Sequence, residues 1–451
     1  MDSLDSLVAV PGRHIWRSDP DLADYTSLLP HVKRGWQAHQ RCFEGQRWMV
    51  YSHSMQPISL YFHIPFCIHR CAYCDFNTYA GLDHLYPEYV EALCSELEYL
   101  SNSVRDTQVI KTIFFGGGTP SLLPVKQLER VLLAVDKHFQ ILPEIEITLE
   151  ANPGTISLEY LQNLVMLGVN RLSLGMQSAN SWELRLLERQ HSLEDVIQAV
   201  KLARKAGFLN LNLDLIYGLP DQQIQEWVMN LTQAVALRPD HLSLYALTLE
   251  HGTPMEKWVR RGLVSEPDQD GAAEMYEFSM DYLSRQGYIQ YEISNWAGVD
   301  VRGFAKPCLH NLQYWRNQPY LGVGAGAHGY ANGVRVANVL APARYIHRYM
   351  KGSEKRNHEF PKTPSTVSLK KIDERDEMAE TMIMGLRLVD EGVSKPRFFR
   401  RFDRTLESVY GAEINELIKL GLLEWGGDSK NRLRLTPNGR LLGNQVFIRF
   451  V

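Results

Sequence analysis

Residues 58–74 read ISLYFHIPFCIHRCAYC and hold the feature that decides the fold. The apolar run 58–64 predicts a buried strand, and Cys67, Cys71 and Cys74 follow it on one short loop with the spacing CxxxCxxC. Three thiolates placed in this way can bind three corners of an iron–sulfur cubane, which leaves the fourth iron without a protein ligand. The sequence therefore predicts a [4Fe-4S] cluster with one open, reactive iron on the loop after the first strand.

A structural zinc site is the main alternative for these cysteines. Such a site usually has four closed ligands, commonly from two separated pairs, and here His69 lies between the cysteines instead. The other cysteines, Cys42, Cys94 and Cys308, are scattered along the chain, and Cys94 is expected in the core of a helix. Six cysteines in 451 residues are too few for a disulfide scaffold and indicate a reducing compartment, the cytosol.

Short strand-like runs alternate with amphipathic stretches over the first half of the chain. We expect strands at 58–64, 111–118, 144–152, 171–178, 210–219 and 241–247, and helices at 87–100, 124–138, 157–167, 192–206 and 222–237. Repeated βα units with right-handed crossovers build an α/β fold, either an open doubly wound sheet or a barrel. Both bind ligands at the C-terminal ends of their strands, and periodicity alone does not choose between them.

The second half of the chain has a different organisation. We expect a βα domain over 55–340, a linker over 341–366 and a small C-terminal domain over 367–451. Helical runs near 371–388, 395–402 and 407–420, a hairpin from 422–425 and 432–435, and a last helix predict an α+β, winged-helix-like shape. Residues 1–54 lack a regular period and read as a loose extension or as the product of a misassigned start codon.

Charge and hydropathy argue against two classes of function. The formal net charge is −4, and residues 366–451 carry 15 Lys and Arg against 13 Asp and Glu, so a DNA-binding winged helix is disfavoured. No run approaches the roughly 18 apolar residues that cross a bilayer. We therefore expect a cytoplasmic protein that binds no nucleic acid and has no transmembrane segment.

The CxxxCxxC spacing with a following aromatic residue, Phe76, is similar to the signature of radical S-adenosylmethionine (SAM) proteins. The resemblance implies a partial or full βα barrel in which the open iron chelates the amino and carboxylate groups of SAM. Residues 116–120, GGGTP, resemble the methionine-binding turn of that family, where glycine lets the backbone approach a ligand. The resemblance implies that the SAM-binding residues are Tyr61, Phe76, Gly117, Gly118, Thr119, Glu150, Gln177, Arg189 and Asp214.

Longer motifs narrow the resemblance to the oxygen-independent coproporphyrinogen III oxidase group. They are YFHIPFC (61–67), GGGTP (116–120), LEANPGT (149–155), GMQS (175–178) and DLIYGLP (214–220). True oxidases of this group have a fourth cysteine two residues after the third, and Phe76 stands there in this chain. That substitution is similar to the HemW branch, whose members are heme chaperones.

Residues 310–315, HNLQYW, resemble the HNxxYW motif of the same branch. An imidazole can ligate heme iron, and tyrosine and tryptophan rings offer flat faces to a macrocycle. We therefore expect heme contacts from His310, Asn311, Tyr314 and Trp315, whereas Cys308 reads more readily as a small buried residue than as an alternative ligand.

Together these features favour a heme chaperone that passes heme to an acceptor hemoprotein. The resemblance implies respiratory-chain acceptors, and hence transient contact with membrane proteins, with the cluster and SAM acting in structure, homodimerisation or release. The alternative is a radical enzyme that decarboxylates coproporphyrinogen III to protoporphyrinogen IX, so whether the chain is an enzyme stays open. A winged-helix heme sensor on DNA is a third, disfavoured hypothesis.

Overall fold

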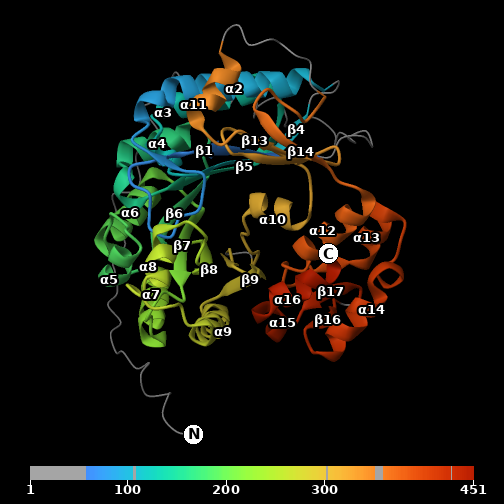
Figure 1. Cartoon of the computed structure of the whole chain (residues 1–451). Coiled ribbons are helices and arrows are strands. Elements are labelled where there is room, and N and C mark those ends of the chain that lie inside the picture. The colour runs from blue at the N-terminus through green and yellow to red at the C-terminus, as the bar shows by residue number, and fades with distance from the viewer. Residues whose placement is uncertain (1–56, 105–107, 301–302, 351–358, 428) are drawn as a thin grey trace. The chain divides into compact units, whose positions relative to one another are not determined.

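The computed structural model describes residues 57–104, 108–300, 303–350, 359–427 and 429–451 (Figure 1). The predicted extension over residues 1–54 lies outside the described residues. Within the described ranges, no helix combines the length and the apolar character that spanning a bilayer requires.

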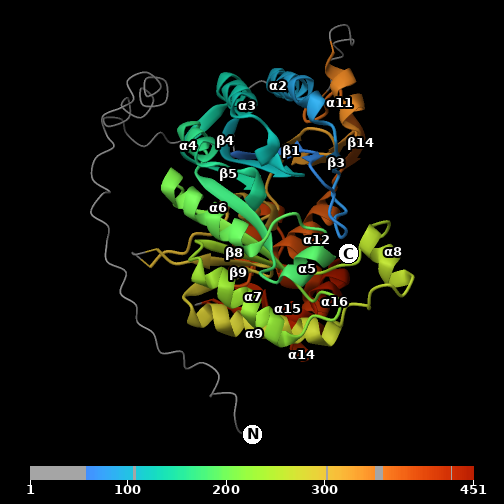
Figure 2. The same cartoon turned by 90° about the vertical axis from the view of Figure 1, so that its left-hand side faces the viewer.

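Six parallel strands in chain order form the centre of the large sheet. All six predicted strands are confirmed: β1 (Ile58–Ile64), β4 (Val109–Gly117), β5 (Gln140–Ala151), β6 (Arg171–Gln177), β7 (Leu211–Tyr217) and β8 (His241–Ala246). The five predicted helices between them are also confirmed: α2 (Tyr86–Asn102), α3 (Val125–His138), α4 (Leu158–Met166), α6 (Leu193–Ala206) and α7 (Ile224–Ala236). These helices cover one face of the sheet (Figures 1 and 2).

The sheet is larger than predicted and open, with twelve strands in the order β14-β13-β12-β11-β1-β4-β5-β6-β7-β8-β10-β9. β11 (Tyr320–Val323) is parallel to β1, and the outer strands at both ends are antiparallel. The added strands are β9 (Tyr288–Glu292), β10 (Asn295–Gly298), β12 (His328–Ala331), β13 (Val334–Asn338) and β14 (Thr366–Lys371). The two edge strands, β14 and β9, do not pair with each other, so the sheet does not close into a full barrel. This open sheet agrees with the partial βα barrel that the resemblance implies.

Several shorter elements connect the strands. The helices are α5 (Ser181–Leu186), α8 (Pro254–Arg260), α9 (Gln269–Arg285), α10 (Leu309–Trp315) and α11 (Pro342–Tyr349), with 3-10 turns at Asp83–Leu85, Pro120–Leu122, Pro153–Thr155 and Ile448–Phe450. The segment 341–366, expected as a linker, contains regular structure at both ends. Helix α11 occupies Pro342–Tyr349, and β14 begins at Thr366. Proline at the start of α11 is a normal first-turn residue, and its buried Tyr345 packs against α2. Residues 351–358 lie outside the described residues.

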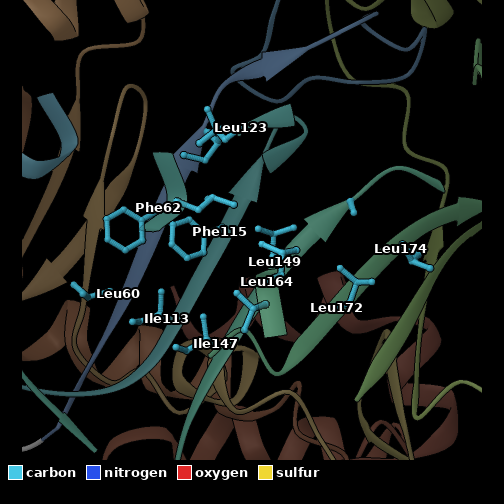
Figure 3. Packing of buried hydrophobic residues seen from close by; sticks show 14 of the residues in the cluster. Leu60, Phe62, Ile113, Phe115, Leu123, Ile147, Leu149, Leu164, Leu172 and Leu174 are labelled. Carbon is cyan, nitrogen blue, oxygen red and sulfur yellow. The ribbon is translucent and has the colours of Figure 1, made fainter. Parts of the chain in front are cut away.

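The core of the sheet is built by alternation along the central strands. Figure 3 shows the side chains that β1, β4, β5 and β6 turn to the same layer: Leu60, Phe62, Ile113, Phe115, Ile147, Leu149, Leu172 and Leu174. Each of these side chains is fully buried. The spacing of two residues puts one set of side chains under the covering helices, so the opposite face of each strand is left for the polar groups described below.

One buried carboxylate ties the end of the sheet together. Glu96 on α2 is fully buried and accepts hydrogen bonds from five groups. The donors are the Gly324 amide, the Asn338 amide group and the hydroxyls of Tyr345, Thr363 and Ser365. These bonds satisfy the carboxylate without a cation and fix α11 and the segment before β14 against α2.

The C-terminal residues have their own hydrophobic core. The predicted helices and hairpin are confirmed as α12 (Glu374–Gly385), α13 (Lys395–Phe402), α14 (Leu406–Lys419), β16 (Leu423–Gly426) and β17 (Arg432–Leu435). A two-residue strand, β15 (Val393–Ser394), was missed and completes a three-stranded sheet in the order β15-β17-β16. The predicted last helix is divided into α15 (Pro437–Leu441) and α16 (Gly443–Phe447).

Candidate functional site

The cysteine loop begins where β1 ends and is held by a small parallel pair, β2 (Phe66–Cys67) and β3 (Tyr79–Ala80). All three thiols are half-buried, and each has a polar neighbour. Thr119 Oγ1 donates to Cys67 Sγ at 3.8 Å, Arg189 Nη1 donates to Cys71 Sγ at 3.5 Å, and Cys74 Sγ lies 3.9 Å from Thr78 Oγ1. Hydroxyl and guanidinium donors of this kind stabilise sulfur ligands that carry negative charge.

Burial makes two of the three thiols, Cys67 and Cys74, harder to ionise. Burial raises the pKa of Cys67 to about 11, against a smaller lowering by the Thr119 hydroxyl, and Cys74 and Cys71 raise it further. Burial likewise raises the pKa of Cys74. Binding of a cluster would have to displace the protons of Cys67 and Cys74, so cluster binding would be favoured by higher pH.

The donor chemistry fits a cluster better than a single metal ion. Among the described residues, no three His, Cys, Asp or Glu side chains converge on a point that suits one ion. A cubane does not require such convergence, because each thiolate binds a different iron. The three cysteines lie on one short loop, each with its own polar neighbour, which is the donor set that such a cluster takes.

The glycine turn after β4 lies directly against the cysteine loop. The Gly118 amide donates to the Ile64 carbonyl oxygen at 2.8 Å, and a Cβ at Gly118 would lie 2.6 Å from the Phe66 carbonyl oxygen. Gly117 has φ +112°, and a Cβ there would lie 2.6 Å from the His63 ring. Close approach of neighbouring atoms therefore requires glycine at both positions, and the positive φ angle is a further requirement at Gly117.

The ends of β5, β6 and β7 bring the predicted polar residues together. Arg189 Nη2 donates to Asn152 Oδ1 at 2.6 Å and to the Gly175 carbonyl oxygen at 3.0 Å. A Cβ at Gly175 would lie 2.9 Å from Gln177 Nε2, so Gln177 and Arg189 meet over this glycine. Asp214 pairs with Gly175 in the strand register and accepts hydrogen bonds from Ser173 and Asn212.

Two carboxylates at this rim affect each other. Burial raises the pKa of Glu150 to about 8, with a further rise from Asp214 and a smaller lowering from the Gly117 amide, which donates to Glu150 Oε2 at 3.1 Å. Burial also raises the pKa of Asp214. Two neighbouring carboxylates in a partly dry site favour a ligand that brings hydroxyl or ammonium donors.

A cavity of about 380 Å³ opens beside the glycine turn. Its lining includes Tyr61, Phe76, Gly117, Glu150 and, from α10, Tyr314. The structure thus brings predicted SAM-binding residues and one residue of the HNLQYW segment to the same cavity. The ring of Phe76 is 63% exposed at this position.

Two residues that the sequence analysis missed orient Tyr61. Tyr61 OH lies 3.1 Å from His63 Nδ1, and His63 Nε2 lies 2.9 Å from the Asn77 carbonyl oxygen. Since a carbonyl oxygen only accepts, His63 Nε2 is the donor and Nδ1 accepts the tyrosine proton. Asn152, which binds Arg189, was also missed, although it lies inside the LEANPGT motif.

The HNLQYW segment forms α10, which a buried glutamate caps. Glu146 on β5 accepts hydrogen bonds at 3.0 Å from the amides of Leu309 and His310. The His310 ring is buried, with Nδ1 2.8 Å from Thr112 Oγ1 and Nε2 2.8 Å from Tyr314 OH. Burial lowers the pKa of His310 to about 3, aided by Arg171 and Lys111, so the imidazole is neutral. Both ring nitrogens are engaged within the protein.

The predicted heme residues do not share one surface. Tyr314 lines the cavity beside the glycine turn, whereas Trp315 lines a second cavity toward the C-terminal residues. Cys308 is fully buried, as expected for a small core residue, and burial raises its pKa to about 12. Asn311 lies on α10 at the edge of this polar interior, where its side chain bonds Tyr291.

Comparisons with known proteins agree with this geometry. The Radical SAM superfamily model matches residues 61–232, and the HemN C-terminal domain model matches residues 372–442. The heme chaperone HemW of Lactococcus lactis is 38% identical over 396 residues, which are 88% of this chain and 98% of the relative. HemW of Escherichia coli is 35% identical over 404 residues, covering 88% and 99%.

Among solved structures, coproporphyrinogen III oxidase HemN from Escherichia coli superposes with a TM-score of 0.73 over 88% of this chain and 90% of that one. The two sequences are 22% identical in this superposition, so the likeness shows a shared fold and no more.

Proposed function

The chain belongs to the HemW family of radical SAM proteins, and we propose that it is a heme chaperone that binds heme and transfers it to an acceptor hemoprotein. In this proposal Cys67, Cys71 and Cys74 hold a [4Fe-4S] cluster, and SAM binds at the rim formed by the ends of β4 to β7. We expect the protein to act in the cytosol, because its three cluster thiols must stay reduced.

The arrangement of the rim supports SAM as the second ligand. Gly117 and Gly118 let the turn after β4 pack closely against His63 and the start of the cysteine loop, and Thr119 donates to Cys67. Glu150 and Asp214 offer acceptors for ribose hydroxyls or an ammonium group, while Gln177 offers an amide beside Arg189. When bound, the cluster supplies an open iron for chelation and an electron source.

The observation that carries the proposal is the position of α10. This helix holds the HNLQYW segment, its Tyr314 lines the cavity next to Phe76, and Phe76 stands where the oxidase pattern has a fourth cysteine. The sequence-level alternative, coproporphyrinogen III oxidase, has the shared fold as its support, which is not evidence of a shared activity.

We place heme beside α10 without making His310 its ligand in the described conformation. Ligation through His310 Nε2 would break the bond to Tyr314 OH and expose a ring that is now buried. Trp315 therefore becomes the leading macrocycle contact, with His310, Asn311 and Tyr314 supporting the helix. The proposal also includes respiratory-chain proteins as the heme acceptors and a homodimer as the assembled state. Light scattering on the purified protein would measure its mass and so test the homodimer.

The test is anaerobic reconstitution of the cluster followed by hemin titration of the full chain. We expect saturation near one heme per chain, and weaker binding in His310→Ala, because loss of the ring loosens α10. His347→Ala, an exposed histidine on α11, is the matched control and should bind like the wild type. Absence of hemin uptake, together with decarboxylation of coproporphyrinogen III, would replace the chaperone function with the oxidase function.

A further inference from the structure

A second and larger cavity lies on the other side of the HNLQYW helix. Its volume is about 730 Å³, within the range of roughly 300–1,000 Å³ that is usual for cofactor sites. Trp315 and Arg316 from the end of α10 form one part of its lining, and residues of α12, β15 and α13 form another. This cavity is separate from the one beside the glycine turn, and its lining contains none of the predicted SAM-binding residues.

Positive charge is concentrated on one helix of this cavity. α13 reads KPRFFRRF, and Arg397, Arg400 and Arg401 all line the cavity because positions three and four residues apart share a helix face. With Arg316 there are four arginines in the lining, against the two carboxylates Glu377 and Glu391, which leaves a net charge of +2. The near-neutral total of the C-terminal residues conceals this concentration.

The four arginines differ in whether a carboxylate of the protein already pairs with them. Arg316 forms a bidentate pair with Glu391, Arg397 also pairs with Glu391, and Arg401 pairs with Glu377. Arg400 is exposed, and its side chain has no hydrogen-bond or ion-pair partner among the described residues. Arg397 shares its carboxylate with Arg316, so Arg400 and Arg397 are the guanidinium groups with capacity for a ligand anion.

The cavity also has apolar walls. Trp315 lies at one side, with the Arg387 guanidinium 4.5 Å from the centre of its ring, which holds the indole in place. Leu388, Val393 and Phe398 also border the cavity, although each is almost wholly buried. An aromatic ring in a mixed polar and apolar lining, together with a pair of available arginines, fits a flat molecule that carries two carboxylates.

The described lining residues include no histidine, cysteine or methionine, and the one tyrosine among them, Tyr330, has its hydroxyl hydrogen-bonded to Glu377. A ligand held here would be recognised by its ring and its carboxylates instead of by a strong axial bond to iron. Such binding suits delivery, because no coordinate bond has to break when the ligand leaves.

We propose that this cavity binds a tetrapyrrole dicarboxylate, with Trp315 against the macrocycle and Arg397 and Arg400 paired with its two propionates. The inference rests on the proposed chaperone function and deepens it, since it places the cargo on the C-terminal side of α10 and makes the iron dispensable for binding. The HNLQYW segment then contributes to two cavities. Tyr314 lines the cavity at the glycine turn, and Trp315 lines the larger cavity that would hold the tetrapyrrole.

The experiment measures binding of metal-free protoporphyrin IX and of its dimethyl ester to the full chain with reconstituted cluster, by porphyrin fluorescence. We expect protoporphyrin IX to bind the wild type near one per chain and Arg400→Gln to bind it about tenfold more weakly, as for a lost charged hydrogen bond. The ester should bind the wild type about tenfold more weakly than the acid, and Arg400→Gln should cause no further loss for the ester. Trp315→Leu should weaken the binding of both.

Arg375→Gln is the matched control, because Arg375 is an exposed arginine on α12 outside the cavity lining. Thermal unfolding of each variant checks that the fold is retained, and Arg397→Gln provides a second arginine variant if Arg400→Gln is unstable. Binding of hemin but not of metal-free porphyrin would overturn the inference, since axial ligation would then dominate.

The inference and the proposed function can fail separately. Wild-type hemin uptake that is unchanged in Arg400→Gln, Arg397→Gln and Trp315→Leu would leave the chaperone function in place and overturn the cavity assignment. A wild type that takes up neither hemin nor protoporphyrin would overturn both.

Discussion

The glutamate that caps α10 gives the sharpest test of how the heme segment is held. Glu146 is buried and accepts the amides of Leu309 and His310 at 3.0 Å each. Although burial alone lowers the pKa of Arg171, nearby acidic groups, with Cys308 and Glu146 the largest contributors, raise it above its usual value. Glu146 therefore serves both the helix N-terminus and a buried cation.

Glu146→Gln keeps the shape of this side chain and removes its charge. A hydrogen bond to a charged group contributes about 1.5–3 kcal/mol, against about 1 kcal/mol for a neutral one, and the glutamine NH₂ group cannot accept from the second amide. Because one amide bond is lost and the other loses its charged acceptor, we expect the free energy of opening α10 to fall by about 3 kcal/mol. The global stability should fall by less, because the strands of the sheet keep their own contacts.

Hydrogen exchange measured on peptides that cover residues 307–316 is the direct assay. A loss of this size corresponds to amide exchange up to about 100-fold faster at Leu309 and His310. Glu144→Gln is the control, because Glu144 lies on the same strand and is exposed. Equal exchange in Glu146→Gln and the wild type would refute the idea that this carboxylate positions the heme segment.

Three further predictions follow from single sites. Cys71→Ser should prevent cluster assembly, measured as bound iron and sulfide after reconstitution, whereas Cys94→Ser should keep the full content because that thiol lies in a helix. Glu96→Gln should lower the free energy of unfolding by about 2–3 kcal/mol, since one amide oxygen cannot satisfy five buried donors, while exposed Glu98→Gln should change it by less than about 0.5 kcal/mol in urea unfolding. His310 has its pKa lowered to about 3, so the unfolded chain binds the proton first and stability is lost as pH falls below the ordinary value of 6.5. Lowering the pH from about 6.5 to 5.5 should therefore cost the wild type about 1 kcal/mol more than His310→Gln in urea unfolding, and equal losses would contradict a neutral buried imidazole.

The central strands and the cluster loop were predictable because their signals are local. Alternating or continuous apolar runs such as 58–64 and 171–178 specify strands whatever surrounds them, and three cysteines within eight positions specify their own chemistry. β11 and β12 were missed because Tyr320–Val323 and His328–Ala331 are short and contain glycine. They become strands by pairing with β1 and its neighbours, a condition that no local window contains.

The grouping of polar residues at the strand ends was partly predictable for a topological reason. Parallel βα units bring the ends of successive strands to one edge, so Glu150, Gln177 and Asp214 could be grouped without knowing any distance. The sequence did not show which of these polar side chains form hydrogen bonds with one another. Arg189 reaches both Cys71 and Asn152, and Gly175 is the small residue that lets Arg189 and Gln177 meet.

The heme segment shows where pattern and packing separate. The sequence analysis treated His310 and Trp315 as members of one site because both belong to the HNxxYW motif. A helix turns about 100° per residue, so residues that far apart face different neighbours, and here the neighbours are a buried polar interior and an arginine-lined cavity. The basic character of α13 was missed for a related reason. The net charge was summed over the whole C-terminal segment, where acidic residues of α12 and α14 offset the arginines of α13. A charge count by helix face, not by domain, would have singled out the basic face of α13, with Arg397, Arg400 and Arg401, from the sequence.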